Sequence, residues 1–545
     1  MSSSSSSTPR PTKTYEDALA LLSQLQSNRH IVNLFSSQPD TAQQDINSLA
    51  IPEMRAWLAR AGYPTPESLS SSGLKVVHVA GTKGKGSVSA LVSGILRQYA
   101  AAGEDEGEVV VGTYVSPHVV DVRERILLNG EVIGKDKFAK YFFEVWERLS
   151  RAAREAGDAV PDAAGGGGVP DEESEREAWY DGAATKPFYF RFLTILAFHI
   201  FVSEPGVRWA VVECGIGGEY DSTNVLPAEM VTAAVVTQLG VDHVSMLGDT
   251  VPKIAWHKAG IFKEGVRGFT RELKETKEGE EVMEVLRTRA EEKGASGLVE
   301  VKDEEVERWR GVQGAKLEGP FQKYNMALAV AAAREHLLKV GVRLDGEFAE
   351  TGGLDKMPVE FEKGLREASL KGRCEVLKDE EGVEWFVDGA HTEDSLRGVG
   401  EWFAGKVRGG EDKAVRVLVF NQQDRDPTVL VRALLDGVQG KEGGSTRPVF
   451  THAVFTRNEE APPADGEAER DLGIQTKARD TLLEYFGSMK GEVDTTVRNA
   501  VQPTIELVRS IARHAKEEGK ECKVLVTGSF HLLGAVLKTI DHVEL

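Results

Sequence analysis

A glycine-rich segment between two apolar runs carries the residues best suited to bind a phosphate group. Gly81–Ser87 reads GTKGKGS; the run LKVVHVA precedes it and the helix-compatible run VSALVSGILRQY follows. Glycines let a loop turn tightly and aim backbone N–H groups at an anion, and the following helix adds its positive dipole end. Lys85 would then reach the outer phosphates of a nucleotide, and Ser87 could hold a magnesium ion. The segment predicts a phosphate loop, with a glycine-rich hairpin as the alternative.

The spacing within this loop is unusual, because Gly86 separates Lys85 from Ser87. The standard phosphate-loop motif places the hydroxyl residue directly after the lysine. The loop by itself predicts only nucleotide binding, so the reaction has to be inferred from other residues.

Polar side chains follow two later apolar runs that are typical of buried parallel strands. Glu213 closes VRWAVVECG, and His243 follows VTAAVVTQLG. The carboxyl ends of parallel strands form the ligand crevice of α/β folds, so Glu213 is a candidate ligand for magnesium beside a triphosphate. A helix cap or a salt bridge is its other interpretation, and a lone histidine at such a place is more often structural. Lys258, in AWHKAGIF, lies in a predicted helix, where most lysines are surface charges.

Composition indicates a soluble globular protein of two substantial domains. The chain has 545 residues, of which 41% are hydrophobic and 28% charged, and its formal net charge is −20. This acidity argues against nucleic acid as the main partner, and no apolar run approaches the roughly 20 residues of a membrane span. The three scattered cysteines fit free thiols in a reducing compartment. We expect a cytoplasmic protein, with a mitochondrial form from an alternative start left open.

Alternating strand and helix signals predict an α/β fold. We expect a disordered tail over residues 1–14, a first domain over 15–356 and a second over 357–545, because strand and helix alternation starts afresh near Met357. The acidic segment Gly103–Glu108 is expected to be a loop insertion. A longer polar, glycine-rich insertion over about 155–186 is expected to be flexible, since it offers little apolar surface to offset the entropy of ordering.

A series of motifs resembles those of the folylpolyglutamate synthases, the fungal branch in particular: GTKGKGS, SPHVVDVRERI, VECGIGGEYDSTNV, LGVDHVSMLGDT, HKAGIFK, GRCEVL, VDGAHTEDS and FNQQDRD. The resemblance runs from about Tyr15 to the C-terminus, and the wider group is the Mur ligases. It implies a phosphate-loop, Mur-ligase-like central domain with a parallel-rich sheet, which binds ATP and folate, and a smaller Rossmann-like C-terminal α/β domain. In this family the extra glycine before the loop serine is typical.

The resemblance also implies roles for individual positions. Nucleotide contacts are matched by Gly81, Thr82, Lys83, Gly84, Lys85, Gly86, Ser87, Gln322, Asn325, Arg373 and Asp388. Magnesium ligands are matched by Ser116, Glu213 and His243, and the catalytic set by Lys85, His243 and Lys258. Lys258 matches the lysine that is carbamylated in relatives. His391 either lines the cleft or is structural.

The implied activity is an ATP-dependent ligase that adds L-glutamate to the γ-carboxylate of tetrahydrofolates through an acyl phosphate. This is folate polyglutamylation in one-carbon metabolism. The implied cofactors are ATP, Mg²⁺ and a monovalent cation such as K⁺. The implied partners are folate and L-glutamate, and we expect the protein to be a monomer. Dihydrofolate synthase on the same fold is the nearest alternative. A phosphate-loop ATPase or switch protein is another, and it predicts ATP turnover without glutamate.

Overall fold

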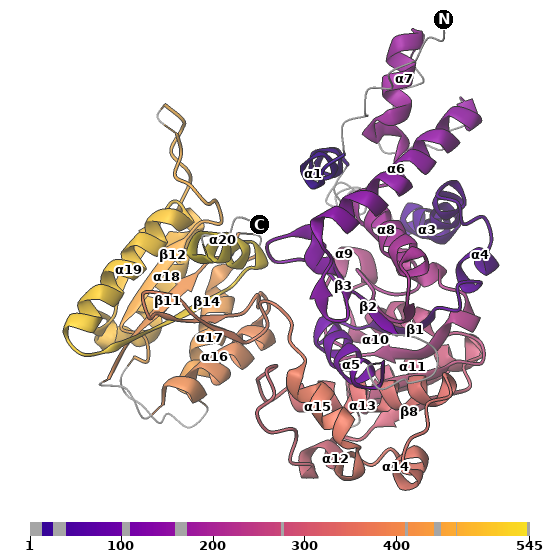
Figure 1. Ribbon diagram of the computed structural model, residues 1–545. Helices are drawn as coiled ribbons and strands as arrows, with labels where there is room; N and C mark the ends of the chain where they lie inside the picture. Colours follow the sequence, from indigo (N-terminus) through magenta and orange to yellow (C-terminus); the bar gives the residue numbers. More distant parts are fainter. Residues whose placement is uncertain are drawn as a thin grey trace, which may run out of the picture. The chain divides into compact units, whose positions relative to one another are not determined.

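The computed structural model describes residues 13–25, 40–100, 109–157, 170, 172–273, 277–408, 413–423, 425–440, 448–464 and 466–541. The chain divides into two compact units (Figure 1). The first comprises Met1–Pro117, Arg123–Arg310 and Ala327–Gly364, and the second His118–Val122, Gly311–Met326 and Leu365–Leu545. The serine-rich start of the expected tail and the segment 103–108 lie outside the described residues. In the described part of the chain, no helix has the length and apolar character needed to cross a membrane.

The first unit is built on an eight-stranded sheet in the order β4-β3-β2-β5-β1-β6-β7-β8. Neighbouring strands from β2 to β8 pair in parallel, and β3 and β4 add an antiparallel edge. The central strands read as unbroken β-branched and alanine runs because both faces of a parallel sheet are covered. The strands are β1 (Lys75–Ala80), β2 (Val110–Tyr114), β3 (Ile126–Leu128), β4 (Glu131–Val132), β5 (Val207–Glu213), β6 (Val231–Val236), β7 (Arg267–Arg271) and β8 (Gly297–Val301).

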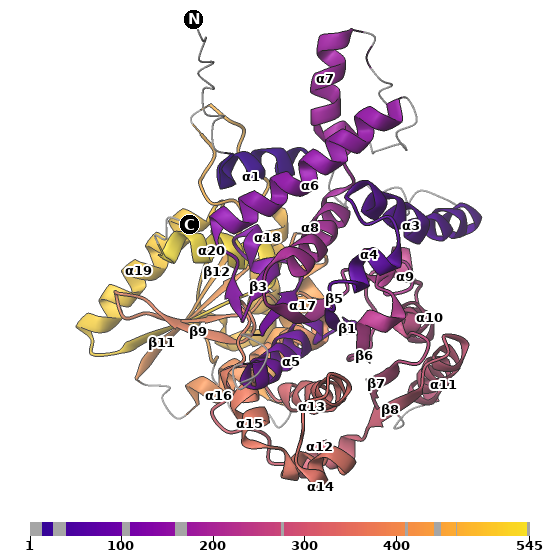
Figure 2. The ribbon, with the colours of Figure 1, turned by 45° about the vertical axis from the view of Figure 1, so that its right-hand side comes forward.

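Helices surround this sheet, and α5 starts within the predicted phosphate loop and packs on β1, β2 and β5 (Figure 2). The helices that lie wholly or partly in the first unit are α1 (Tyr15–Gln24), α3 (Asp40–Arg60), α4 (Pro66–Ser70), α5 (Lys85–Ala100), α6 (Lys135–Ala156), α7 (Glu173–Asp181), α8 (Tyr189–Ser203), α9 (Val244–Leu247), α10 (Val251–Lys258), α11 (Lys277–Glu292), α12 (Asp303–Arg308), α13 (Gln322–Lys339), α14 (Gly346–Thr351) and α15 (Val359–Glu367).

The second unit has a six-stranded sheet in the order β13-β12-β11-β14-β10-β9, parallel except for the edge strand β9. One apolar cluster packs α16, α17 and α18 on one face, and another packs α19 and α20 on the other. This is the predicted Rossmann-like arrangement. Its elements are β9 (Glu375–Lys378), β10 (Glu384–Val387), α16 (Glu393–Val407), β11 (Ala414–Phe420), α17 (Pro427–Gln439), β12 (His452–Thr456), α18 (Gly473–Phe486), β13 (Asp494–Arg498), α19 (Val501–Glu517), β14 (Glu521–Thr527) and α20 (Phe530–Asp541).

The main division between the units falls between Gly364 and Leu365, after the boundary expected near Met357. Most of α15 belongs to the first unit because it packs on α5: a Cβ on Gly364 would lie 2.5 Å from the Ile95 Cα. The ring of Phe361 also meets Tyr99 edge-on, with centroids 5.7 Å apart. Close packing of α15 on α5, which no local sequence pattern indicates, therefore sets the boundary.

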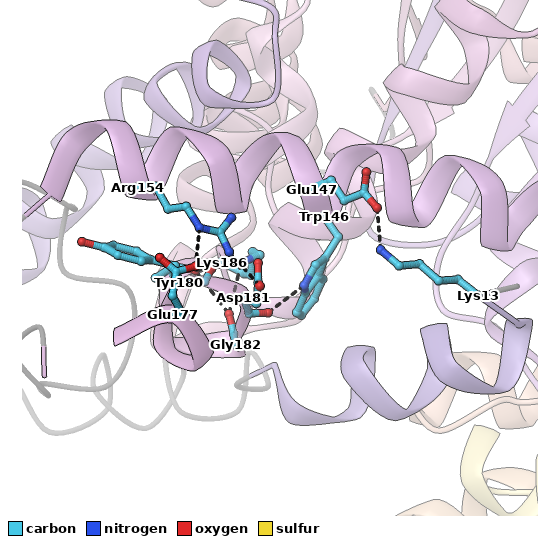
Figure 3. A network of polar contacts seen from close by, with 10 residues as sticks. Lys13, Trp146, Glu147, Arg154, Glu177, Tyr180, Asp181, Gly182 and Lys186 are labelled. Carbon is cyan, nitrogen blue, oxygen red and sulfur yellow. Dashed lines mark hydrogen bonds and ion pairs between the residues drawn. The ribbon is translucent and has the colours of Figure 1, made fainter. Parts of the chain in front are cut away.

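The second half of the expected flexible insertion is ordered, so that prediction is wrong for residues 172–186. Helix α7 lies against α6, where Arg154 donates to Glu177 and, at 2.7 Å, to Asp181 (Figure 3). The Trp146 indole N–H donates to the Asp181 carbonyl at 2.9 Å. Lys186, which is 1% exposed, donates to the Tyr180 carbonyl at 3.0 Å. Ion pairs to α6, the Trp146 hydrogen bond and the burial of Tyr180 and Lys186 together hold this polar segment in place.

Candidate nucleotide and metal site

The predicted phosphate loop is held by the end of the neighbouring strand β6. The backbone N–H groups of Thr82 and Lys83 both donate to the Gln238 carbonyl at 3.0 Å. The Thr237 hydroxyl donates to the Lys83 carbonyl at 2.7 Å. These two N–H groups are thus bound within the protein, and anion binding by backbone amides falls to the start of α5, where helical N–H groups lack intrahelical partners.

Gly81 has a conformation and a position that no other residue type fits. Its φ is +149°, and a Cβ at this position would lie 1.8 Å from the Thr237 hydroxyl oxygen. Gly84 also has a positive φ, of +84°. The Lys85 amine lies 3.5 Å from the Thr82 carbonyl, folded back over the loop. Gly81 therefore allows the loop after β1 to lie close to Thr237 after β6, and Gly81 and Gly84 both allow the loop to turn.

Strand register brings the other predicted residues of the first unit to the same edge of the sheet. Val79 of β1 pairs with Glu213, and Ala80 pairs with Val236 of β6. Ser116 follows β2, and its backbone N–H donates to the Glu213 carboxylate at 3.1 Å. Because these strands are neighbours, the loop, Glu213 and Ser116 emerge side by side, as the carboxyl ends of parallel strands do.

Glu213, Ser116 and His243 have the chemistry of a magnesium site. Glu213 is only 2% exposed, and a buried carboxylate requires a compensating partner. Carboxylate and hydroxyl oxygens are ligands that magnesium prefers. His243 lies beyond β6 with φ +50°, its Nε2 3.7 Å from an Asp242 carboxylate oxygen and its side chain 43% exposed. Among the described residues, no group of three His, Cys, Asp or Glu side chains is placed to hold a metal ion by itself, so a magnesium site here would need the serine hydroxyl or other ligands as well.

Lys258 is buried beneath the phosphate loop instead of lying on the surface. Its side chain is 2% exposed, and its amine donates to the Gly81 carbonyl at 2.7 Å. Burial, followed by repulsion from Lys85, lowers the pKa of Lys258 to about 7. At neutral pH much of this amine is therefore uncharged, and an uncharged amine is the form that reacts with carbon dioxide. The predicted carbamylation is compatible with this environment and stays a prediction.

Asp221 is a site residue that the sequence analysis missed. It is 5% exposed and accepts hydrogen bonds from the backbone N–H groups of Gly215 and Ile216 at 2.9 and 3.0 Å. It also accepts from the Thr223 hydroxyl at 2.6 Å. Burial raises the pKa of Asp221, and these hydrogen bonds oppose the rise. The loop that follows Glu213 is fixed in this way. The sequence pattern that could have predicted this role of Asp221 is Asp-Ser-Thr, which is typical of a helix cap.

In the second unit, Asp388 follows β10 and organises the chain beside it. Its two carboxylate oxygens accept from the backbone N–H groups of Cys374 and Ala390, each at 2.8 Å. Burial raises the pKa of Asp388, and Arg373 opposes the rise. The Arg373 guanidinium lies 4.3 Å from the centre of the Phe530 ring. Arg373 and Asp388 are thus brought together, as the predicted nucleotide contacts require.

The remaining predicted residues of the second unit occupy two places. Gln322 and Asn325 lie within Gly311–Met326, and the Asn325 amide donates to the Gln322 side chain at 2.9 Å. Both are buried. His391 lies within hydrogen-bond distance of the Gly389 carbonyl, at 3.1 Å, and its ring meets Phe530 edge-on. These contacts orient His391 and leave both of its interpretations open.

Curated proteins of two fungi are similar to this chain over nearly its full length, although no protein-family model matches it. A probable folylpolyglutamate synthase of Schizosaccharomyces pombe is 37% identical over 541 residues, which cover 97% of this chain and 95% of that protein. The folylpolyglutamate synthase of Saccharomyces cerevisiae, strain FostersO, is 35% identical over 543 residues, which cover 98% and 88%.

Solved structures share the fold. Folylpolyglutamate synthase of Mycobacterium tuberculosis, complexed with ADP and AMPPCP, matches with a TM-score of 0.60 at 23% identity, over 89% of this chain and 95% of that one. E. coli FolC in complex with DHPP and ADP matches with a TM-score of 0.58 at 20% identity, over 98% and 99%.

Proposed function

This chain belongs to the folylpolyglutamate synthase family, whose activity is ATP-dependent folate polyglutamylation, and from that premise we propose how its residues carry out the reaction. The observation that supports the proposal most is that the phosphate loop and Glu213 lie at adjacent strand ends of one sheet, with the buried amine of Lys258 from α10 bound to the loop. A switch protein also uses the loop and a metal-binding carboxylate, but it has no need of a buried amine beneath the loop.

The proposed reaction has two displacements. An oxygen of the folate γ-carboxylate attacks the γ-phosphorus of ATP, ADP leaves, and an acyl phosphate forms. The amino nitrogen of L-glutamate then attacks the carbonyl carbon, the C–O bond to phosphate breaks, and the surplus proton of the amine passes to solvent. Activation is needed because a carboxylate offers no leaving group, and the phosphorylated carbonyl does.

The chain's own residues would lower the barrier by charge and position. Lys85 neutralises the negative charge that collects on the transferred phosphoryl group. Ser116, Glu213 and His243 would hold magnesium, which supplies Lewis-acid neutralisation of the phosphate oxygens when it is bound. Lys258, directly beneath the loop at Gly81, fixes the loop or, as a carbamate, provides a further anionic ligand, for which a monovalent cation such as K⁺ is a proposed companion. Arg373 stays the proposed phosphate contact of the second unit.

The choice of folate separates this proposal from dihydrofolate synthase. Purified protein is incubated with ATP, magnesium, labelled glutamate and either tetrahydrofolate or dihydropteroate. We expect tetrahydrofolate to be extended. Extension of dihydropteroate alone would assign the chain to the other ligase, and ATP hydrolysis that needs neither glutamate nor folate would assign it to the ATPases. Lys85→Ala should abolish extension, and full activity of that variant would refute the assigned role.

We also propose a monomer that acts in the cytoplasm, with a mitochondrial form. The cysteines Cys214, Cys374 and Cys522 are all free and buried, which suits a reducing compartment. Light scattering of the purified 59.4 kDa chain tests whether it is a monomer. Fractionation of the source cells tests where it acts.

A further inference from the structure

Helix α11 reaches the loop that follows Glu213 through one buried arginine. Arg289 is 7% exposed, and its guanidinium donates to the Glu219 carboxylate in a close ion pair. The second oxygen of Glu219 accepts from Lys293, the residue that directly follows α11, at 2.8 Å. The Arg289 guanidinium also lies 4.3 Å from the centre of the Trp256 ring, a cation–π contact with helix α10. Arg289 therefore contacts the loop and α10 at the same time.

The loop at Glu219 lies directly against the end of α10 that carries Lys258. The Glu219 N–H donates to the His257 carbonyl at 2.7 Å. A Cβ on Gly218 would lie 2.7 Å from the carbonyl oxygens of both His257 and Lys258. The backbone contact is so close that a displacement of this loop displaces the helix end as well. The Lys258 amine ends 2.7 Å from the Gly81 carbonyl, so the same displacement changes the position of Lys258 relative to the phosphate loop.

Arg289 is not among the predicted site residues, and its helix α11 carries none of them. Its Nε is buried and has no hydrogen-bond partner among the described residues, a cost that a purely surface ion pair would avoid. Helices α10 and α11 lie side by side (Figure 2). The neighbouring Arg287 on α11 shows the ordinary case: its side chain is 44% exposed, and it forms an ion pair with Glu300 of β8.

We propose that Arg289 is a positioning residue for the ligase reaction. By clamping Glu219 and Trp256 together, it holds the Lys258 end of α10 at a fixed distance from the phosphate loop. This inference rests on the proposed role of Lys258 in the reaction. It adds that the position of the Lys258 amine depends on α11, outside every motif that carries the family resemblance.

The test compares Arg289→Ala with Arg287→Ala, a matched loss of an arginine on the same helix. Because small misplacements of catalytic groups cost rate more than binding, kcat of R289A should fall about tenfold or more. The KM for ATP and for folate should change by less than about twofold. Millimolar guanidinium should restore much of the rate of R289A by occupying the vacated site between Glu219 and Trp256, whereas urea should not. R287A should retain its rate.

The outcomes separate positioning from general stability and from failure of the proposed function. Millimolar guanidinium is far too dilute to change protein stability in general, so rescue by guanidinium without rescue by urea reports occupation of the site between Glu219 and Trp256, and the unfolding temperature of R289A with and without guanidinium separates restored stability from restored rate. A kcat of R289A within twofold of the unaltered enzyme, or a loss that guanidinium leaves unchanged, overturns the inference. If R289A does not fold, Glu219→Gln, which keeps the backbone contact to His257, replaces it, and full activity of that variant is equally decisive. Lys258→Ala with full activity would instead overturn the proposed role of Lys258, and an unaltered enzyme that adds no glutamate to tetrahydrofolate would overturn the proposed function.

Discussion

Replacing Lys258 with methionine should stabilise the first unit at low pH while it abolishes the ligase reaction. Burial lowers the pKa of Lys258 from 10.5 to about 7, in a side chain that is 2% exposed. The folded state therefore binds this proton less tightly than the unfolded chain does. A difference of about 3.5 pKa units, at about 1.4 kcal/mol each, costs the folded state about 5 kcal/mol below pH 7.

Methionine removes this cost, and with it the hydrogen bond to the Gly81 carbonyl, a loss of about 1 kcal/mol. K258M should thus be more stable than the unaltered protein by about 4 kcal/mol at pH 6. Between pH 7 and 10.5 the unfolded chain holds the proton and the folded state does not, so the stability of the unaltered protein rises with pH. The gap between the two proteins should then close by about 1.4 kcal/mol per pH unit.

Hydrogen exchange of β1 and α5 peptides between pH 6 and 9 measures this gap within the first unit. The buffer is depleted of carbon dioxide so that the amine stays unmodified. Lys253→Met is the control, because Lys253 lies on the same helix with a 64% exposed side chain and should show no comparable pH dependence. A difference between K258M and the unaltered protein that is the same at pH 6 and pH 9 would refute the reasoning.

Two further changes test the loop and the insertion. Gly81→Ala puts a Cβ 1.8 Å from the Thr237 hydroxyl oxygen. We expect this variant to bind a non-hydrolysable ATP analogue at least about tenfold more weakly when binding is measured by calorimetry. The control is Gly134→Ala, where a Cβ meets nothing within 4 Å and the analogue should bind normally. Arg154→Ala removes the ion pairs between α7 and α6. Amide hydrogen exchange in α7 should then rise by at least about tenfold, while the ligase rate stays unchanged. Unchanged exchange would show that these ion pairs do not hold α7 in place.

The sequence could predict those parts of the site whose geometry is local. A glycine-rich turn between an apolar run and a helix specifies a phosphate loop, and the structure has it between β1 and α5. Glu213 could be placed because a strand's end is visible as the end of an apolar run. The parallel order of β5, β1 and β6 then follows from the α/β pattern, and it puts these ends together.

Other features depend on contacts between distant segments, which leave no local pattern. Lys258 had the ordinary interpretation of a surface lysine, and only the fold buries it under Gly81. The strand Gly297–Val301 lies in a highly charged region and pairs with β7 at the sheet edge, where burial is partial and alternation is weak. The polar helix α7 is held by pairs to α6, so its composition alone indicated a segment that would not order.

The phosphate loop itself shows why a motif is not yet a site. Two of its N–H groups donate to Gln238, its Lys83 carbonyl accepts from Thr237, and its Gly81 carbonyl accepts from Lys258. Every one of these partners lies at or beyond the end of β6, more than a hundred residues further along the chain. The loop is therefore pre-organised by the strand and helix that also supply His243 and Lys258. A change that removes the contacts of Thr237 or Lys258 with the loop must therefore alter phosphate binding and the catalytic lysine together. A change that reaches only the position of Lys258 through α11, such as Arg289→Ala, is expected to lower the rate and leave nucleotide affinity nearly unchanged.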